Sequence, residues 1–266
     1  MVDPERTLGT SLSFFMRILV LSDIHANLEA LQTCLAAAPQ YDIVWNLGDL
    51  VGYGASPNEV IDVSRKLGKF FVRGNHDKAC SGVSSLEGFN PIAAAAAMWT
   101  MHQLTEDNLE WLRTLPRGPL KPGEVDGALC VHGSPLDEDE YLIQLRDAMQ
   151  PLSQSEVPVT FFGHTHIQGG FATDKKEWVT IRPTYQDDGK CEHLEMQLLP
   201  RAHYLINPGS IGQPRDGDPR AAFVVFDSSK LTVTFYRIPY NIKAAQQKIN
   251  AADLPPRLAQ RLAEGH

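Results

Sequence analysis

RILVLSDIHAN at residues 17–27 and DIVWNLGDLVG at residues 42–52 are the two stretches that decide the fold. Each begins as a continuous apolar run and then reaches an aspartate, and a run without polar alternation is typical of a strand buried on both faces. Between them, the leucines of residues 28–38 fall on one side of a helix that Asn27 can cap. Strand, helix and strand in this order predict an α/β fold.

The remaining pattern extends this fold. We expect a helix at residues 56–68, a third strand with its exit loop at 69–77, and two helices at 91–104 and 105–115. The second half is rich in β-branched and aromatic residues, which favour strands. Its expected strands lie at residues 127–133, 159–166, 177–183, 193–200, 221–227 and 231–238, and two short helices follow Tyr240. These halves predict two mixed β-sheets packed face to face, with helices on the outer sides.

Composition narrows the class of protein. The shares of hydrophobic residues, 43%, and charged residues, 21%, are ordinary for a soluble globular chain. The formal net charge of −8 argues against a nucleic-acid partner, which needs a basic surface. No apolar stretch reaches the roughly 20 residues of a membrane span. The four cysteines are scattered without a CxxC pair, which favours a reducing, cytoplasmic location.

The chain shows no internal repeat and no convincing interdomain linker. We therefore expect residues 16–266 to form a single domain. Met16 directly precedes the first strand, so residues 1–15 are expected to be a loose N-terminal extension. The sequence does not determine the oligomeric state.

Five short polar segments each follow an apolar strand run. They are Asp23-Ile-His25, Gly48-Asp49-Leu50-Val51-Gly52, Gly74-Asn75-His76-Asp77, Val131-His132-Gly133 and Gly163-His164-Thr165-His166. In open α/β sheets, ligand sites gather outside the carboxyl ends of the strands, so these segments are expected to meet at one edge. Imidazole and carboxylate ligands without thiolate suit Mn, Fe, Zn or Ni. Two such ions can clamp the oxygens of a phosphoryl group during an in-line displacement.

In this order, the five segments resemble the signature of the calcineurin-like metallophosphoesterase superfamily. The stretch from Asn207 to Ala221 and the tail around Leu254 resemble its small prokaryotic phosphodiesterase branch. The resemblance implies two divalent or trivalent transition-metal ions and hydrolysis of a phosphate ester by a hydroxide that bridges them. It therefore implies that no side chain acts as a covalent nucleophile.

The resemblance also implies a role for each residue. His76 would protonate the leaving alkoxide or bind the phosphoryl oxygens, and Asp49 would bridge the two ions. Asp77 is expected to cap the turn after His76. The ligands implied for the first ion are Asp23, His25 and His166, and those implied for the second are Asn75, His132 and His164.

One motif departs from that of two other groups in the superfamily. In Ser/Thr protein phosphatases and symmetrical diadenosine-tetraphosphate hydrolases, the second segment extends to an arginine that grips the phosphate, and the protein phosphatases place an acid just before it. Gly52 and Tyr53 stand at those positions here. A phosphodiester carries one negative charge and needs a bidentate guanidinium less than a monoester dianion does. The departure therefore favours diesters.

Three further residues are candidate substrate contacts. Arg215 could partly replace the missing arginine, or it could pair with Asp216 or Asp218. Asn27 and Tyr53 could contact the substrate, or they could serve as a helix cap and a packing residue, respectively. The loops expected to shape the substrate site are residues 80–100, 134–155 and 184–220.

The sequence thus predicts a metal-dependent phosphodiesterase that acts on a small phosphorylated metabolite, a nucleotide or a cyclic nucleotide. The alternatives are a phosphomonoesterase, including a Ser/Thr-type protein phosphatase, a nuclease, and a non-catalytic scaffold of the same fold. A scaffold would be expected to lose ligands or the catalytic histidine, whereas all seven ligands and His76 are present.

Overall fold

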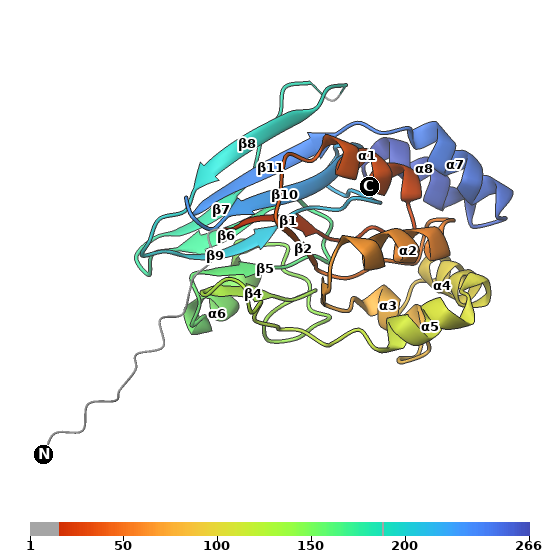
Figure 1. Ribbon diagram of the computed structural model, residues 1–266, viewed down its shortest axis with the longest axis horizontal. Helices are drawn as coiled ribbons and strands as arrows, with labels where there is room; N and C mark the ends of the chain where they lie inside the picture. Colours follow the sequence, from red (N-terminus) through yellow and green to blue (C-terminus); the bar gives the residue numbers. More distant parts are fainter. Residues whose placement is uncertain (1–15, 188) are drawn as a thin grey trace, which may run out of the picture.

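Two β-sheets pack face to face in the computed structural model, which describes residues 16–187 and 189–266 (Figure 1). The six-stranded sheet runs in the order β3 (Phe70–Phe71), β2 (Ile43–Asn46), β1 (Arg17–Leu21), β10 (Ala221–Asp227), β11 (Thr232–Ile238) and β8 (Glu192–Gln197). The five-stranded sheet runs in the order β4 (Ala128–Cys130), β5 (Val159–Phe161), β9 (His203–Asn207), β6 (Gly169–Thr173) and β7 (Trp178–Ile181).

Both sheets mix parallel and antiparallel pairs, as the sequence predicted. Strands β1, β2 and β3 are parallel, whereas β10 pairs antiparallel with β1. Strands β4, β5 and β9 are parallel, whereas β6 pairs antiparallel with β9. The parallel halves of the two sheets carry the site residues at their carboxyl ends.

Strand β1 shows why its sequence is continuously apolar. Ile18 and Val20 belong to the core between the sheets, together with Trp45 and Phe161. Leu19 belongs to a second core on the other side of the strand, which includes residues of the helices. Because successive side chains point to opposite faces of a strand, both faces of β1 must be apolar.

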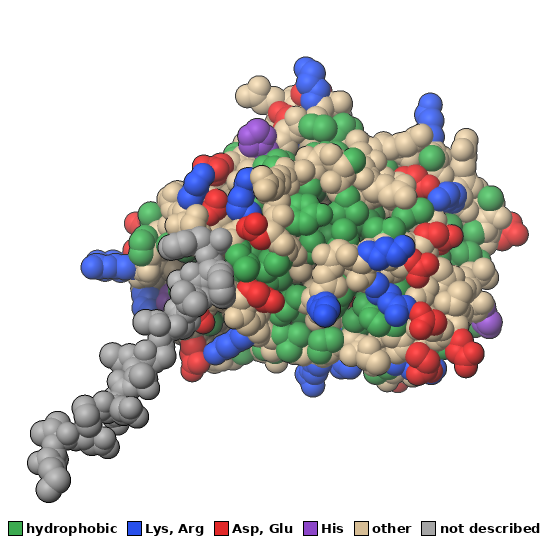
Figure 2. Space-filling view, viewed as in Figure 1, with side chains coloured by type: hydrophobic (Ala, Val, Ile, Leu, Met, Phe, Trp, Pro, Cys, Tyr) green, Lys and Arg blue, Asp and Glu red, His purple; other side chains and the backbone are tan. Residues whose placement is uncertain are grey.

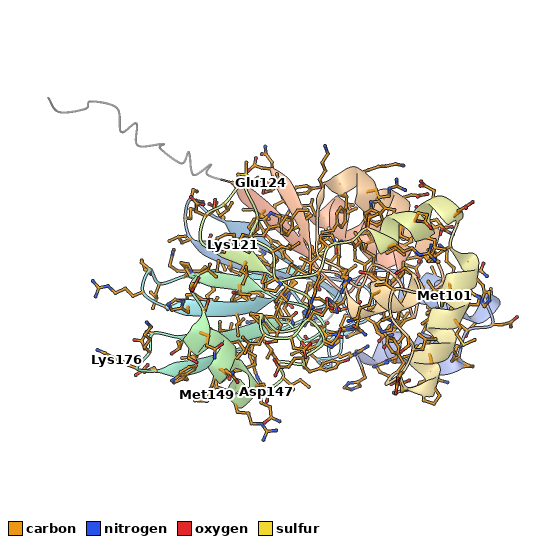
Figure 3. All side chains as sticks on the ribbon, turned by 90° about the horizontal axis from the view of Figure 1, so that it is seen from below. Met101, Lys121, Glu124, Asp147, Met149 and Lys176 are labelled. Atoms are coloured by element: carbon orange, nitrogen blue, oxygen red, sulfur yellow. The ribbon has the colours of Figure 1, made fainter. Side chains whose placement is uncertain are left out.

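Eight helices lie within the described part of the chain. They are α1 (Leu28–Ala37), α2 (Pro57–Leu67), α3 (Asn75–Cys80), α4 (Pro91–Gln103), α5 (Glu106–Arg113), α6 (Leu145–Gln154), α7 (Ile242–Ala251) and α8 (Pro256–Glu264). Helix α1 packs over β10 and β11, whereas α6 packs over β6 and β9, so both outer sides of the sheets carry helices (Figure 1). Met101 on α4 lies at the opposite end of the molecule from Lys176, which follows β6 (Figure 3).

The structure corrects several element predictions. The strand expected within residues 69–77 covers only Phe70–Phe71, and Gly74 caps helix α3, which begins at Asn75. Helix α6 lies where a loop was expected, and Pro151 in its interior weakens the helical sequence pattern. Residues 184–220 were expected to be loops, which is wrong for β9, the central strand of the five-stranded sheet. Strand β6 was also missed, because its glycines disfavour a strand.

Three further sequence expectations concern membrane spans, surface charge and domain organisation. Within the described ranges, no helix is both long and apolar enough to cross a membrane. Acidic and basic side chains are interspersed on the face shown in Figure 2, without a basic stripe. The extension expected over residues 1–15 lies outside the described residues, and the single domain expected for 16–266 stays a prediction.

Candidate metal centre

The seven residues expected to bind metal gather at the carboxyl edge of the two sheets. Residues after β1, β2 and β3 come from one sheet, and residues after β4 and β5 come from the other. Asn75 is partly exposed. The buried residues are Asp23, His25, Asp49, His132, His164 and His166. The sequence argument from strand ends therefore located these side chains correctly.

The backbone at this edge is held in a costly conformation. Five of the seven residues have φ between 49° and 67°: Asp23, His25, Asp49, His164 and His166. A non-glycine residue rarely adopts this left-handed region, and such outliers cluster at functional sites. The surrounding contacts must therefore stabilise these turns.

One group of possible ligands surrounds Asp23. The donor atoms of Asp23, His25, Asp49 and His166 all lie within 4.8 Å of one another. The Nε2 atom of His166 lies 3.3 Å from Oδ1 of Asp23, and Nε2 of His25 lies 3.5 Å from Oδ2 of Asp49. Asp23 is held in place by the hydroxyl of Ser22, which donates to its Oδ2 at 2.6 Å. This group could hold one metal ion.

A second group shares Asp49 with the first. The donor atoms of Asp49, His132 and His164 also lie within 4.8 Å of one another. Oδ2 of Asp49 is 3.4 Å from Nε2 of His132, so the same oxygen faces both groups. The side-chain oxygen of Asn75 adds another donor, 3.2 Å from Nε2 of His132.

Backbone carbonyls orient three of the imidazoles. Nδ1 of His25 lies 3.0 Å from the carbonyl oxygen of Val51, and Nδ1 of His166 lies 2.6 Å from that of Gln213. Nδ1 of His132 likewise lies 2.9 Å from the carbonyl oxygen of Leu47. A carbonyl only accepts, so each Nδ1 carries the proton, as is common for histidine ligands of metals.

This orientation provides a test of whether the residues fit a metal. With Nδ1 protonated, the Nε2 atoms of His25 and His166 both point lone pairs at each other across 3.1 Å. Burial holds the pKa of both residues well below the ordinary value, which keeps them neutral. Two facing lone pairs repel unless a cation lies between them. The donor set therefore fits a bound metal ion.

The charge balance at Asp49 fits the same conclusion. Burial opposes ionisation of Asp49, but its contacts with His132 and His76 hold its pKa well below the ordinary value. Burial alone would lower the pKa of His132, yet the Asp49 carboxylate raises it to about 10. A proton on His132 thus supplies the positive charge that a metal ion would otherwise bring.

His76 lies beside these groups without binding a partner through Nδ1. Its ring contacts Tyr53, with 4.3 Å between the ring centroids, and Phe89, at 5.0 Å. Nδ1 is buried and has no hydrogen-bond partner among the described residues. Gly52 covers this nitrogen, since an added Cβ would lie 2.4 Å from it. Burial lowers the pKa of His76 to about 4, so its imidazole is neutral at neutral pH.

Asp77 does more than cap the turn after His76. Its carboxylate accepts the amide of Gly74 at 3.0 Å, as expected for a cap. It also accepts the amides of Asp49 and Leu50, each at 2.8 Å. The amide of His76 in turn donates to Oδ1 of Asp49 at 2.8 Å. Asp77 therefore joins the second and third motifs and orients the shared carboxylate.

A cleft of about 360 Å³ opens over the second group. Residues from the expected loops 80–100 and 134–155 contribute to it. Tyr141, which the sequence did not single out, stacks on His164 with 3.8 Å between ring centroids. The lining residues are Tyr53, Asn75, His76, Lys78, Ser84, Ser85, Glu87, Gly88, Phe89, Asn90, Ala93, Asp139, Tyr141 and His164. Such a mixed aromatic and polar lining suits an organic group on a phosphate.

The three candidate substrate contacts lie in different surroundings. Tyr53 lines the cleft, whereas Asn27 caps α1 and donates to the carbonyl of Gly212 at 2.9 Å. The guanidinium carbon of Arg215 lies 5.5 Å from the centre of the Tyr53 ring. Neither candidate acidic partner holds Arg215, because Asp216 pairs with Arg237 and Asp218 with Arg220. All three contacts with substrate stay predictions.

The turn after β9 supports the site from behind, a role that sequence reasoning missed. Asn207 donates to the carbonyl of Gly163 at 2.9 Å, and the hydroxyl of Ser210 donates to the carbonyl of Asp23 at 2.7 Å. Gln213 supplies the carbonyl that orients His166. The family resemblance of residues 207–221 was the available signal, because these side chains are not metal ligands.

Comparison with known proteins agrees with this geometry. Residues 16–230 match the model of the calcineurin-like phosphoesterase superfamily domain. An uncharacterised protein of Methanocaldococcus jannaschii is 34% identical over 92% of this chain and 96% of its own length. A metallophosphoesterase of Sphaerobacter thermophilus has a crystal structure with a TM-score of 0.82 and 38% identity, covering 95% of this chain and all of that one.

A third relative matches over a shorter region. A symmetrical bis(5′-nucleosyl)-tetraphosphatase of Baumannia cicadellinicola is 36% identical over 101 residues, which is 36% of this chain and 35% of that protein. The domain match covers most of the chain, and the long relatives match nearly all of it. The chain therefore belongs to the calcineurin-like phosphoesterase superfamily.

Proposed function

We propose that this protein is a two-metal phosphodiesterase that hydrolyses a small phosphorylated metabolite, a nucleotide or a cyclic nucleotide. The single observation that carries the proposal is the position of Asp49, whose Oδ2 lies 3.5 Å from His25 and 3.4 Å from His132. A carboxylate between two ligand groups suits a bridge between two ions. Mn, Fe, Zn and Ni all suit the donor set, and Mn is the first ion to test.

The bound ions would supply positive charge to the phosphoryl oxygens and would lower the pKa of a water molecule. Asp23, His25 and His166 would hold one ion, and the remaining ligands would hold the other. The protein's own contribution is rigid positioning, because burial and carbonyl contacts leave the imidazoles few other orientations. No side chain is required as a nucleophile.

His76 is the proposed proton donor to the leaving alkoxide. Gly52 blocks its Nδ1, so Nε2 is the ring nitrogen available to the substrate. A neutral imidazole with its proton on Nε2 can donate a hydrogen bond to the leaving oxygen as negative charge develops there. The low pKa of His76 leaves its protonated form scarce at neutral pH, so the neutral ring acts through this hydrogen bond.

The preference for diesters rests on the second motif. Tyr53 contacts His76 where the Ser/Thr protein phosphatases and symmetrical diadenosine-tetraphosphate hydrolases of this superfamily carry an arginine. Arg215 lies over Tyr53 and donates to the side-chain oxygen of Gln213 at 2.9 Å. A diester carries one negative charge and needs a bidentate guanidinium less than a monoester dianion does, so a tyrosine at residue 53 favours diesters.

Parallel assays with bis(nitrophenyl) phosphate and nitrophenyl phosphate in the presence of Mn test this proposal. We expect a higher kcat/KM for the diester. A large preference for the monoester would support a phosphomonoesterase or a protein phosphatase instead. A chain that binds less than one metal ion and stays inactive with Mn would instead be a scaffold.

A further inference from the structure

The cleft of about 360 Å³ beside the candidate metal centre is lined by two loops, each of which carries an aromatic side chain. Phe89 comes from the loop between α3 and α4, and Tyr141 comes from the loop between β4 and α6. Asn75, His76 and His164 also line the cleft, so it begins at the second ligand group. An organic group on a phosphate at the metal centre therefore has this cleft beside it.

Both aromatic rings pack on histidines of the site and keep surface for a ligand. Tyr141 stacks on His164, with 3.8 Å between the ring centroids and 29° between the ring planes. Tyr141 is nevertheless 46% exposed, because His164 covers one face of its ring. Phe89 meets His76 at an interplanar angle of 69°. These contacts orient both rings, and an open aromatic face attracts a planar ring such as a nucleobase.

The charged residues of the cleft do not favour a second anion there. Among the described residues that line it, Lys78 is the one lysine or arginine, and its ammonium group already contacts the carboxylates of Asp139 and Glu138. Glu87 also lines the cleft, and no basic side chain in the described ranges lies within 4.0 Å of its carboxylate. Bound metal ions would place their positive charge at the other end of the cleft. The group held between the loops should therefore be uncharged.

We propose that the cleft binds the leaving alcohol of the substrate, and that this alcohol is an uncharged nucleoside whose base stacks on Tyr141 and contacts Phe89. The inference rests on the proposed function, because the reacting phosphate must lie at the metal centre. His76 lines the same cleft and is the proposed donor to the leaving oxygen, so the group that departs is the one held there. Ser84 and Asn90 line the cleft as well and supply hydrogen-bonding groups that suit a base and a ribose.

The methyl ester of adenosine 5′-phosphate tests this orientation, because either of its two ester bonds can break. Hydrolysis adds the hydroxyl group of water to phosphorus, breaks one P–O bond and gives the remaining proton to the released oxygen. We expect adenosine and methyl phosphate as products, because the nucleoside lies beside His76. Release of methanol and adenosine 5′-phosphate would place the nucleoside outside the cleft and overturn the proposal.

A second diester, in which a methoxy group replaces adenine, measures what the base contributes. We expect the wild-type kcat/KM to be about tenfold higher for the adenosine diester, because the base stacks on an aromatic ring. Tyr141→Leu should remove most of this selectivity, whereas Tyr141→Phe should keep it. Leu136→Ala is the matched control, because Leu136 lies in the same loop, is 45% exposed and does not line the cleft. An unchanged ratio of the two kcat/KM values in Tyr141→Leu would reduce Tyr141 to a packing residue and contradict the proposal.

Titration of the Mn-loaded protein with adenosine gives a readout that does not depend on hydrolysis. We expect saturable binding in the wild type that is about tenfold weaker in Tyr141→Leu and unchanged in Leu136→Ala, with equal Mn content in all three. A wild-type chain that does not bind adenosine overturns the proposal. If adenosine binds but neither diester is hydrolysed, the proposed function fails and the nucleoside site stands.

Discussion

Gly52 lies against the imidazole of His76 so closely that a Cβ on residue 52 would lie 2.4 Å from Nδ1. The same glycine has φ of 86°, a conformation that other residues adopt at a cost. In protein phosphatases of this superfamily the equivalent position carries an acid that partners the histidine. Here the histidine keeps an unpartnered Nδ1 and a low pKa, so the proposed proton donor acts as a neutral imidazole.

Replacing Gly52 should therefore lower kcat strongly and lower the free energy of unfolding only modestly. We expect Gly52→Ala to lower kcat about 100-fold or more, since the methyl group must displace the proposed general acid. Gly82→Ala is the matched control, because Gly82 also has positive φ, 75°, but has nothing within 4 Å of an added Cβ. Both variants should lose roughly 1–2 kcal/mol of unfolding free energy. Similar activities for the two variants would show that the contact with His76 is unimportant.

Replacing His76 should reveal its role through the leaving group. We expect His76→Ala to lower kcat by about 10²–10⁴-fold for an alkyl phosphodiester, and less for a nitrophenyl diester, whose leaving group needs little protonation. The bound metal should stay unchanged, which elemental analysis measures. An equal loss for both leaving groups would mean that His76 binds the phosphoryl oxygens rather than protonating the leaving oxygen.

Metal binding should stabilise the fold and should depend on pH. Because a bound ion separates the facing nitrogens of His25 and His166, saturating Mn should raise the melting temperature, and a chelator should lower it. The raised pKa of His132, about 10, means that its proton must leave before Nε2 binds an ion. Apparent affinity for the second ion should thus increase with pH, up to about tenfold per pH unit below that value.

The Asp49→Asn variant tests whether the carboxylate of Asp49 is shared by the two ions. We expect this variant to bind at most one Mn per chain and to lose activity, because the amide lacks the charge that both ligand groups use. Equilibrium dialysis with elemental analysis measures the stoichiometry. Two tightly bound ions in Asp49→Asn would contradict the bridging role.

Glu138 should stabilise the loop that braces His164. Its carboxylate accepts from Arg73 at 2.9 Å and from Lys78 at 3.3 Å, so it links this loop to the two ends of the segment around Asn75. The carbonyl oxygen of the next residue, Asp139, lies 3.1 Å from Nε2 of His164. Glu138→Gln should therefore lower the unfolding free energy by about 2 kcal/mol at neutral pH and weaken binding of the second ion.

The pH dependence of this effect follows from the pKa of Glu138. Burial would raise that pKa, but Arg73 and Lys78 outweigh burial and hold it below the ordinary 4.5. A depressed pKa contributes stability above the unfolded value and loses it as pH falls through the folded value. Chemical denaturation should therefore show a difference between wild type and Glu138→Gln at pH 7 that shrinks in acid below pH 4.5. Glu192→Gln, which removes one of the two carboxylate partners of Arg220, is the control that should leave metal binding unchanged.

The sequence by itself determined the edge of the fold where the site lies. Apolar runs must be buried strands, and the polar residues that end them must meet where parallel strands end, so Asp23, Asp49 and His164 could be brought together without coordinates. Two mixed sheets also followed from the order of the patterns. The missed elements were local exceptions, such as the proline in α6 and the glycines of β6.

Only the tertiary structure decided what surrounds each ligand. The contact of Gly52 with His76, the four amides on Asp77 and the carbonyl of Gln213 on His166 all join residues that the sequence pattern treats as independent. The stacking of Tyr141 on His164 is likewise invisible in the sequence. Periodicity encodes which side of a strand or helix is buried, whereas these contacts depend on how the loops beyond the strand ends pack in space.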